Sequence, residues 1–356
     1  MTVRAAFAPT PKGQGRLPAA ITPRQIRLRA PALAVLSAAL ALACGAGLTS
    51  GAIPISLVEA LLREDASLHR SVLLEIRAPR VLLAGCVGAA LAVSGASLQG
   101  LFRNPLADPG LIGVSSGAAL GASLMIVLGS SLAIGGVLAM VALPGAAIAG
   151  AMLVTGFLYW FSSRFGHFSI VTIVLVGIAA NALAGVGTGA LQYLSDDAAL
   201  RTLTFWLMGS FGRATWPTLL HAALAMAAAA APLLLVARGL DLLQLGEAEA
   251  YHLGVDVRRL KRSVVLGSAA AVGAGVAVAG IVGFVGLVVP HLVRLAIGAS
   301  HRHLLPGAAL LGATLTILAD TVARTAASPA EIPVSLVTSA LGAPFFLWLI
   351  ARERPK

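Results

Sequence analysis

The amino-acid sequence predicts an all-α protein that crosses a membrane many times. Of its 356 residues, 58% are hydrophobic and only 11% are charged, whereas about a quarter of the residues in a soluble domain are charged. The mean hydropathy of the chain is +0.93. Apolar runs recur along the sequence, many of them near the roughly 20 residues that a helix needs to cross a bilayer. A polytopic membrane protein is the fold class that fits these observations.

Ten apolar stretches are candidate membrane spans, which gives about ten helices per subunit. The eighth is too short to cross a bilayer alone, and Pro290 interrupts the apolar run that contains it. That run could instead form one re-entrant feature, buried in protein or lining a water-filled cavity. The ten stretches lie near residues 29–50, 78–102, 111–128, 133–160, 170–194, 214–237, 262–282, 287–298, 305–325 and 333–351.

The two ends of the chain are polar and flank one transmembrane domain. Residues 1–27 are rich in Pro, Gly and Arg and are expected to form a disordered cytoplasmic leader. The transmembrane domain covers residues 28–352, and residues 353–356 form a short cytoplasmic tail. The motif LALACGAG around Cys44 loosely resembles a lipoprotein signal, but nine further spans follow it. We therefore expect a first transmembrane helix there.

The distribution of basic residues predicts the orientation of the chain. Placing both termini in the cytosol puts 18 of the 25 Lys and Arg residues inside, as the positive-inside rule requires. The net charge of +11 comes without a basic helix or an aromatic platform. The charge pattern thus favours a lipid membrane, and no nucleic acid, as the surroundings of this chain.

Two further patterns concern how the spans pack. Gly95 with Gly280, and Pro105 with Pro290, share an offset of 185 residues, which suggests a five-plus-five inverted repeat of the kind that many transporters have. Helices rich in Ala and Gly also look alike by chance, so both interpretations stay open. The 39 glycines fit close helix contacts, because helices in lipid associate through small residues.

The longest inside loop, residues 238–262, contains the sequence LDLLQLGEAEAYHLG. Its apolar residues have helical spacing, and Gly246 divides it. Two short helices joined by a glycine would offer a rigid knob to a partner protein. The alternative is a helix lying on the membrane, but Glu247 and Glu249 stand where such a helix favours Lys and Arg.

The chain lacks the motifs of an enzyme or of a metal site. It has no Walker A sequence, no HExxH, and no His/Cys ligand spacing at Cys44 or Cys86. Ion-coupled carriers need ionisable groups inside the bilayer, and here His221 and Asp320 are the candidates. Asp320 stands four residues before Arg324, so we expect these two side chains to pair. An ion-coupled secondary carrier and a membrane anchor without transport activity remain as alternatives.

Three outside arginines, Arg77, Arg80 and Arg324, stand near span ends. They could face an acidic external partner, because such charges set orientation and association rate. Lipid headgroups, or intramolecular partners such as Glu75 and Asp320, would explain them equally well.

Seven blocks in the same order resemble the permease subunits of ATP-driven importers for iron chelates, haem and cobalamin, the FecCD-type or type II importers. The resemblance covers residues from about Pro54 to Ile350. The blocks are RAPR (77–80), SGASLQGLFRNPLADPGLIGVSSGAALGA (94–122), FWLMGSFG (205–212), GEAEAYHLGV (246–255), GFVGLVVPHLVRLAIGASHRHLLP (283–306), LADTVAR (318–324) and EIPVSLVTSALGAPFFLWLI (331–350).

The resemblance implies a homodimeric permease of the bacterial inner membrane, with the transport path along its two-fold axis. Two ATP-binding subunits, which use ATP and Mg²⁺, and one periplasmic substrate-binding protein would be its partners. The chain itself would bind no cofactor and catalyse no reaction. The variant ADPG, with Gly110, resembles the haem branch, which makes haem the first expectation for the cargo. Ferric siderophores and cobalamin are the alternatives.

The resemblance also assigns roles to individual positions. It implies that Arg77, Arg80 and Arg324 dock the binding protein. It implies a cytoplasmic gate at Asn104, Leu106, Ile170 and Val171, where residues 170 and 171 are more apolar than the small hydroxyl residues of the cobalamin permease. It implies that the ATPase is coupled through Leu245, Gly246, Glu247, Ala250, Tyr251, Leu253 and Gly254.

Overall fold

The computed structural model describes residues 23–51, 67–129, 136–165 and 169–352, and within these ranges the chain is helical and has no strand. Seven helices are long and apolar enough to cross a membrane, and three shorter apolar helices cover Val114–Leu128, Val285–Ile297 and Val334–Leu349. These helices occupy the ten predicted positions, which confirms the all-α polytopic fold class.

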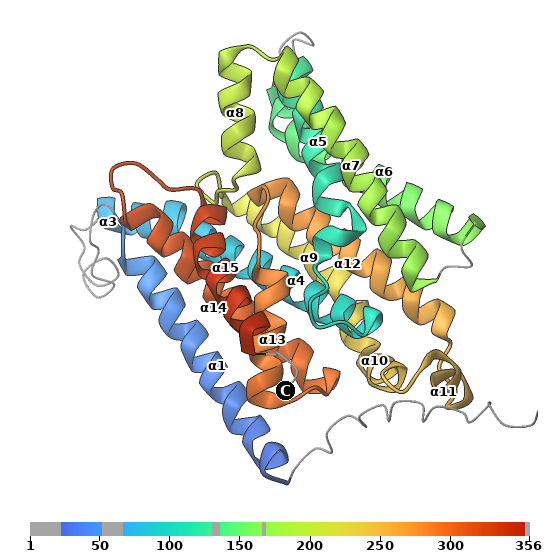
Figure 1. Cartoon of the computed structure of the whole chain (residues 1–356). Helices are drawn as coiled ribbons and strands as arrows, with labels where there is room; N and C mark the ends of the chain where they lie inside the picture. The colour runs from blue at the N-terminus through green and yellow to red at the C-terminus, as the bar shows by residue number, and fades with distance from the viewer. Residues whose placement is uncertain (1–22, 52–66, 130–135, 166–168, 353–356) are drawn as a thin grey trace, which may run out of the picture.

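The elements, with the labels of Figure 1, follow in chain order. They are α1 (Pro23–Thr49), α3 (Ser67–Ser71), the π-helix η1 (Val72–Arg77), α4 (Ala78–Phe102), the 3₁₀ helix η2 (Pro109–Ile112), α5 (Val114–Leu128), α6 (Gly136–Phe165), α7 (Ile170–Leu194), α8 (Asp197–Leu207), α9 (Trp216–Leu235), α10 (Ala237–Leu243), α11 (Glu247–His252), α12 (Val257–Ala279), α13 (Val285–Ile297), α14 (His301–Thr325) and α15 (Val334–Arg352).

Helix α4 is the central element of the bundle, and nearly all of its residues are buried. It packs against α9, α12, α13 and α14. Glycines make the closest contacts: a Cβ added at Gly95 would overlap the carbonyl of Gly286, and one at Gly88 would overlap the carbonyl of Gly312. Small residues let helix backbones approach this closely.

Helices α5, α6 and α7 form a second group, which α12 joins to α4. Glycines also bring α5 and α6 close together, since Gly117 and Gly121 face Gly150. Figure 1 shows α8 at one end of the molecule and α10 and α11 at the opposite end. This arrangement gives the bundle two polar ends separated by apolar helices.

The chain turns between α12 and α13, so the run around Pro290 is not one continuous helix. Helix α12 ends at Ala279, Gly280 has a φ of +71°, and α13 begins at Val285 after Phe284, whose φ is +65°. The structure does not place this run relative to a membrane, and the re-entrant alternative stays a prediction. A glycine at the turn is favoured because a positive φ costs it no Cβ clash.

Some helix ends differ from the expected ones. Helix α12 starts five residues before residue 262, because the Asp256 carboxylate accepts a hydrogen bond from the Arg259 amide at 2.9 Å and caps the helix. The expected third span is also shorter than predicted, since η2 and Gly113 precede α5. Helix α1 includes residues 23–27 of the predicted leader, whereas residues 1–22 and the tail 353–356 lie outside the described residues.

The positions that suggested an inverted repeat have different environments. Gly95 lies inside α4, whereas Gly280 ends α12. Pro105 lies in a loop, whereas Pro290 lies inside α13. The repeat stays a prediction.

Candidate functional site

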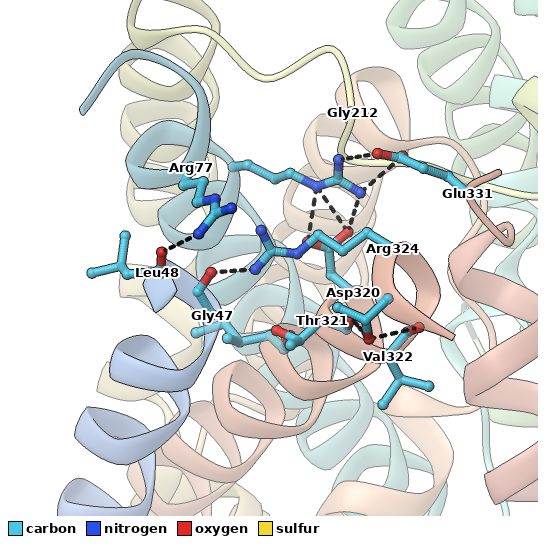
Figure 2. Close-up of polar contacts among 12 residues, drawn as sticks. Gly47, Leu48, Arg77, Gly212, Asp320, Thr321, Val322, Arg324 and Glu331 are labelled. Atoms are coloured by element: carbon cyan, nitrogen blue, oxygen red, sulfur yellow. Dashed lines mark hydrogen bonds and ion pairs between the residues drawn. The ribbon is translucent and has the colours of Figure 1, made fainter. Parts of the chain in front are cut away.

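A buried ion-pair cluster joins α4, α14 and the segment before α15 (Figure 2). Arg80 is 7% exposed. Its guanidinium donates hydrogen bonds to both carboxylate oxygens of Asp320, at 2.9–3.1 Å. It also donates to both oxygens of Glu331, at 2.8 and 3.0 Å. One arginine thus holds two carboxylates in bidentate geometry, the strongest arrangement for such pairs.

Two further arginines complete this arginine cluster. Arg324 lies 3.7 Å from the Asp320 carboxylate, which confirms the pairing predicted from their spacing. Arg324 also donates a hydrogen bond to the Gly47 carbonyl of α1. Arg77 donates to the Leu48 carbonyl at 2.9 Å. The cluster therefore ties α1, α4 and α14 together at one end of the bundle.

The arginine cluster lowers the pKa of Glu331, its most exposed member. Glu331 lies in the segment between α14 and α15, and hydrogen bonds from Arg80 lower the pKa of its carboxyl below the usual value. Burial acts in the opposite direction but is outweighed. Glu331 is therefore expected to stay ionised at neutral pH, which keeps both Arg80 ion pairs intact.

The three arginines with an expected docking role contact the chain itself. Arg77, Arg80 and Arg324 are each at most 7% exposed, so in this conformation they offer little surface to a partner. The intramolecular alternative applies to Arg80 and Arg324, which share Asp320; Glu75 is exposed. Docking through these residues stays a prediction.

A cavity of about 550 Å³ lies beside the arginine cluster. Phe205 and Trp206 of α8, the end of α12, Arg213 and Glu331 line it. Unlike the three buried arginines, Arg213 is exposed. This part of the surface combines aromatic rings, an exposed guanidinium and a carboxylate, and aromatic residues and arginine are enriched in protein interfaces.

The structure also places His221 and the two cysteines, the other residues considered for ion coupling or metal binding. His221 is exposed, and its Nδ1 lies 2.7 Å from the carbonyl of Pro217 in its own helix. Cys44 and Cys86 are free thiols. Within the described part of the chain, no three His, Cys, Asp or Glu side chains are placed to share a metal ion.

The loop after α4 contains the first half of the predicted gate. Arg103 has a φ of +51° and ends α4, and the Asn104 side chain accepts a hydrogen bond from the Leu106 amide at 2.9 Å. Asn104 is exposed and Leu106 is half-buried. Asp108 accepts a hydrogen bond from the Gly110 amide at 2.7 Å, which starts η2. The loop is thus held in one conformation by its own polar side chains.

The second half of the predicted gate begins α7. Ser169 caps the helix by accepting a hydrogen bond from the Thr172 amide at 3.1 Å. Ile170 is half-buried and Val171 is 68% exposed. Among the described residues, no hydrogen bond joins these two positions to the loop after α4. A gate closed by both halves stays a prediction.

Between α5 and α7 lies a cavity of about 400 Å³. Its lining combines small and apolar residues, Gly110 and Ile281 among them, with the polar side chains of Ser116, Asn181, Thr188 and Gln192. Asn181 donates a hydrogen bond to the Gly110 carbonyl at 2.9 Å and lies 2.5 Å from the Ser116 hydroxyl. No charged side chain belongs to this lining as far as the described residues define it. The cavity can accept a bulky ligand without binding it through ion pairs.

Helices α10 and α11 confirm the two short helices predicted in the long inside loop. Gly246 joins them with a φ of +128°, and Gly254 ends the second with a φ of +87°. Ala250 is fully buried, whereas Leu245, Tyr251 and Leu253 are 52%, 69% and 57% exposed. The exposed residues form a partly apolar surface, which we call the α11 surface.

The α11 surface is braced against the transmembrane helices. Glu247 accepts a hydrogen bond from buried Lys261 at 2.7 Å. Gln244 donates to the Gly100 carbonyl of α4 at 2.8 Å. Asp241 accepts hydrogen bonds from the His301 amide at 2.8 Å and the Ser300 hydroxyl at 3.1 Å, and it lies 2.6 Å from the His301 ring. A displacement of α10 and α11 would therefore act on α4, α12 and α14 directly.

Replacing Asp241 with asparagine is expected to cost about 2 kcal/mol of unfolding free energy at pH 7, within the range for hydrogen bonds to a charged group. Burial alone would raise the pKa of Asp241, but its bonds to His301 and Ser300 outweigh burial and lower it. A carboxyl with a lowered pKa stabilises the fold above its unfolded-state pKa of about 4 and loses that effect as the pH falls. Thermal unfolding in detergent should show the native chain and Asp241→Asn converging at acid pH. A gap independent of pH would contradict this role.

Sequence reasoning missed several polar contacts that organise the site. The Gln99 side chain donates to the Leu287 carbonyl at 3.1 Å and accepts from Arg294 at 3.0 Å. Glu331 was not expected to pair with Arg80. A polar residue inside an apolar span was the available signal for Gln99, because such groups require partners in lipid.

Comparison with known proteins agrees with this geometry. The FecCD transport family matches residues 33–352. The hemin transport system permease protein HmuU of Yersinia pestis is 54% identical over 290 residues, covering 82% of this chain and 85% of that protein. The cobalamin import system permease protein BtuC of Halobacterium salinarum is 40% identical over 350 residues, covering 94% and 92%.

Among solved structures, an ABC transporter assigned to the metal-chelate type, in an inward-facing conformation, has a TM-score of 0.81 at 36% identity. The match covers 90% of this chain and 98% of that chain. Sequence and fold agree over nearly the whole length, and the chain belongs to the FecCD transport family.

Proposed function

We propose that this chain is the permease subunit of an ATP-binding-cassette importer that moves haem into the cytoplasm by alternating access. The observation that carries the proposal is 54% identity with a hemin permease across most of both chains. The uncharged cavity between α5 and α7 supports it, because a path without ion pairs would release a bulky apolar macrocycle readily. Gly110 lines that cavity, so a larger residue there would narrow it.

The proposed complex contains two copies of this chain, two ATP-binding subunits and one periplasmic binding protein, in the bacterial inner membrane with both termini of this chain cytoplasmic. ATP and Mg²⁺ would be used by the partner subunits, and this chain would have no resident cofactor. The cavity between α5 and α7 supports the second copy. Its lining includes the side chains of Ser116, Asn181, Thr188 and Gln192, and such polar groups favour water or another protein surface over lipid.

The α11 surface is the proposed seat of the ATP-binding subunit. A movement of α10 and α11 would be transmitted to α4 through the hydrogen bond of Gln244. It would be transmitted to α12 through the pair Glu247–Lys261, and to α14 through the pair Asp241–His301. Two of these helices cross each other at the glycine contact between α4 and α14. Hydrolysis in the partner would thereby change the arrangement of the helices around the path, as a rigid-body transition does.

Replacing Tyr251 and Leu253 together with serine is expected to abolish most ATPase stimulation by the binding protein. These two side chains are the most exposed apolar residues of the α11 surface. Truncating an interface hot spot costs about 2 kcal/mol or more, roughly a 30-fold loss of affinity. Copurification of the ATP-binding subunit and its stimulated hydrolysis in liposomes are the measurements. Tyr193→Ser is the control, because Tyr193 is 89% exposed on α7 and close to α8 at the opposite end. Unchanged ATP hydrolysis in the double variant would show that the ATP-binding subunit does not bind at the α11 surface.

The cargo is tested by reconstituting the complete importer in liposomes with haem, cobalamin or a ferric siderophore, each on its binding protein. Haem is expected to give the largest stimulation of ATP hydrolysis and the only uptake into the lumen. Uptake of cobalamin or a ferric siderophore, with none of haem, would assign the chain to another branch of its family.

An ion-coupled carrier is the alternative from another class. Its best carboxylate, Asp320, is 1% exposed and already paired with Arg80 and Arg324. Such a carrier would move its cargo without the ATP-binding subunit and would respond to a proton or sodium gradient. Haem uptake that requires ATP and is indifferent to ion gradients would exclude it.

A further inference from the structure

Two cavities flank the first turns of α12, at the end of the molecule that carries α10 and α11. One, of about 220 Å³, lies toward α6 and is lined by Tyr159, Ser163, Asp256, Arg258, Arg259 and Arg262. The other, of about 510 Å³, lies toward α9. Arg259 and Arg262 line both cavities. The two guanidiniums therefore stand between one polar and one larger, more apolar space.

The polar cavity has an excess of positive charge. Three guanidiniums face one carboxylate, Asp256, which pairs with Arg259 at 3.0 Å. Arg262 lies over the Tyr159 ring at 5.9 Å from its centroid. Both arginines are exposed, so a ligand can reach their guanidiniums, although Asp256 offsets part of the charge of Arg259. The neighbouring Lys261 is buried and bonded to Glu247.

The aromatic residues of α6 place this cavity at the membrane surface. Phe157, Trp160, Phe161 and Phe165 contact one another on α6, the helix that carries Tyr159. Trp160 and Phe165 are 56% and 62% exposed. Exposed aromatic clusters at the end of a membrane helix mark the depth of the lipid headgroups. The arginines of α12 therefore lie where lipid phosphates lie.

The second cavity continues from the arginines along the apolar surfaces of α9 and α12. Ala229, Pro232, Leu266 and Gly267 line it beyond the guanidiniums. A Cβ at Gly267 would lie 2.9 Å from the Leu233 side chain, so the two helices touch below this space. The site is thus cationic at one end and apolar at the other, as a phospholipid requires.

We propose that this site binds an anionic phospholipid, with its phosphate on Arg259 and Arg262 and an acyl chain in the groove between α9 and α12. Guanidiniums match phosphate oxygens in bidentate geometry, and basic pockets between membrane helices are suited to anionic headgroups. The lipid would brace the start of α12, whose Lys261 holds α11 through Glu247. The site does not depend on which cargo the chain carries.

The test is native mass spectrometry of the full chain, purified in detergent and titrated with phosphatidylglycerol, cardiolipin or phosphatidylcholine. The double variant Arg259→Gln/Arg262→Gln is expected to lose roughly 25-fold in affinity for the anionic lipids, about a factor of five for each basic residue. Its weak binding of phosphatidylcholine should not change. Arg238→Gln is the matched control, because Arg238 is exposed at the same end and lines neither cavity.

The charge-preserving variant Arg259→Lys/Arg262→Lys should lose less affinity than the glutamine variant, because it keeps both charges but not the bidentate geometry. This comparison separates loss of charge from loss of fold. Equal binding of phosphatidylcholine and phosphatidylglycerol by the native chain would overturn the proposal. Full displacement of lipid by millimolar inorganic phosphate would show a site for a free anion instead. Loss of the ATP-binding subunit by the glutamine variant, with lipid affinity unchanged, would show that the arginines face a protein.

Discussion

Replacing Arg80 with glutamine is expected to lower the free energy of unfolding by about 3–5 kcal/mol, the usual cost of breaking a buried ion pair on one side. Asp320, 1% exposed, would keep only Arg324, whose guanidinium is 3.7 Å away, in place of three hydrogen bonds from Arg80. Glu331 would also lose both of its bonds to Arg80. Unfolding by denaturing detergent in mixed micelles measures the change.

Two further variants separate the ion pair from general damage. Arg80→Met with Asp320→Leu removes the Arg80–Asp320 pair and should cost less than the single change, because the buried Asp320 carboxylate is no longer left without Arg80. Arg324 keeps its hydrogen bond to the Gly47 carbonyl. Arg201→Gln should have almost no effect, since Arg201 is exposed on α8. A cost for Arg80→Gln no larger than for Arg201→Gln would contradict the structural role of the cluster.

This cluster also decides how the docking prediction must be tested. Charge reversal at Arg77 or Arg324 would introduce a buried carboxylate and disturb the fold, so lost transport would not report docking. Arg213 is exposed beside the same cavity. Arg213→Glu is the cleaner probe of an acidic binding protein.

Replacing Gly95 with alanine is expected to destabilise the bundle by about 1–3 kcal/mol, the range found when extra carbon atoms are forced into a packed core. The added methyl group would overlap the backbone carbonyl of Gly286, which cannot move away as a flexible side chain can. Helices α4 and α13 would have to separate, which also stretches the bonds of Gln99 to α13.

Gly156→Ala in α6 is the matched control, because a Cβ at Gly156 meets no atom within 4 Å. It should be neutral or slightly stabilising, since alanine is the better helix former. Equal effects of the two substitutions on the denaturation midpoint would show that helix propensity, and not the α4–α13 contact, sets the cost.

Patterns that are local in sequence were predictable. The ten apolar stretches, the two short helices divided by Gly246, and the pairing of Asp320 with Arg324 all follow from spacing within one element. The start of α12 was misplaced, because its first turns carry Arg258, Arg259 and Arg262 and look like a loop. Long basic side chains at a helix end reach the interface, so charge alone does not end a membrane helix.

By itself the sequence determined the class of protein, the approximate spans and the family, because hydropathy and ordered motifs depend on neighbouring residues only. The tertiary structure alone decided which polar groups on different elements meet. Arg80 and Glu331 stand 251 positions apart, and Asp241 and His301 stand 60 apart. Inside a membrane a buried polar group must find a partner on whichever helix lies beside it. Which helices lie side by side depends on close packing, such as the approach of α4 to α13 and α14 at glycines. No spacing along the chain predicts that packing.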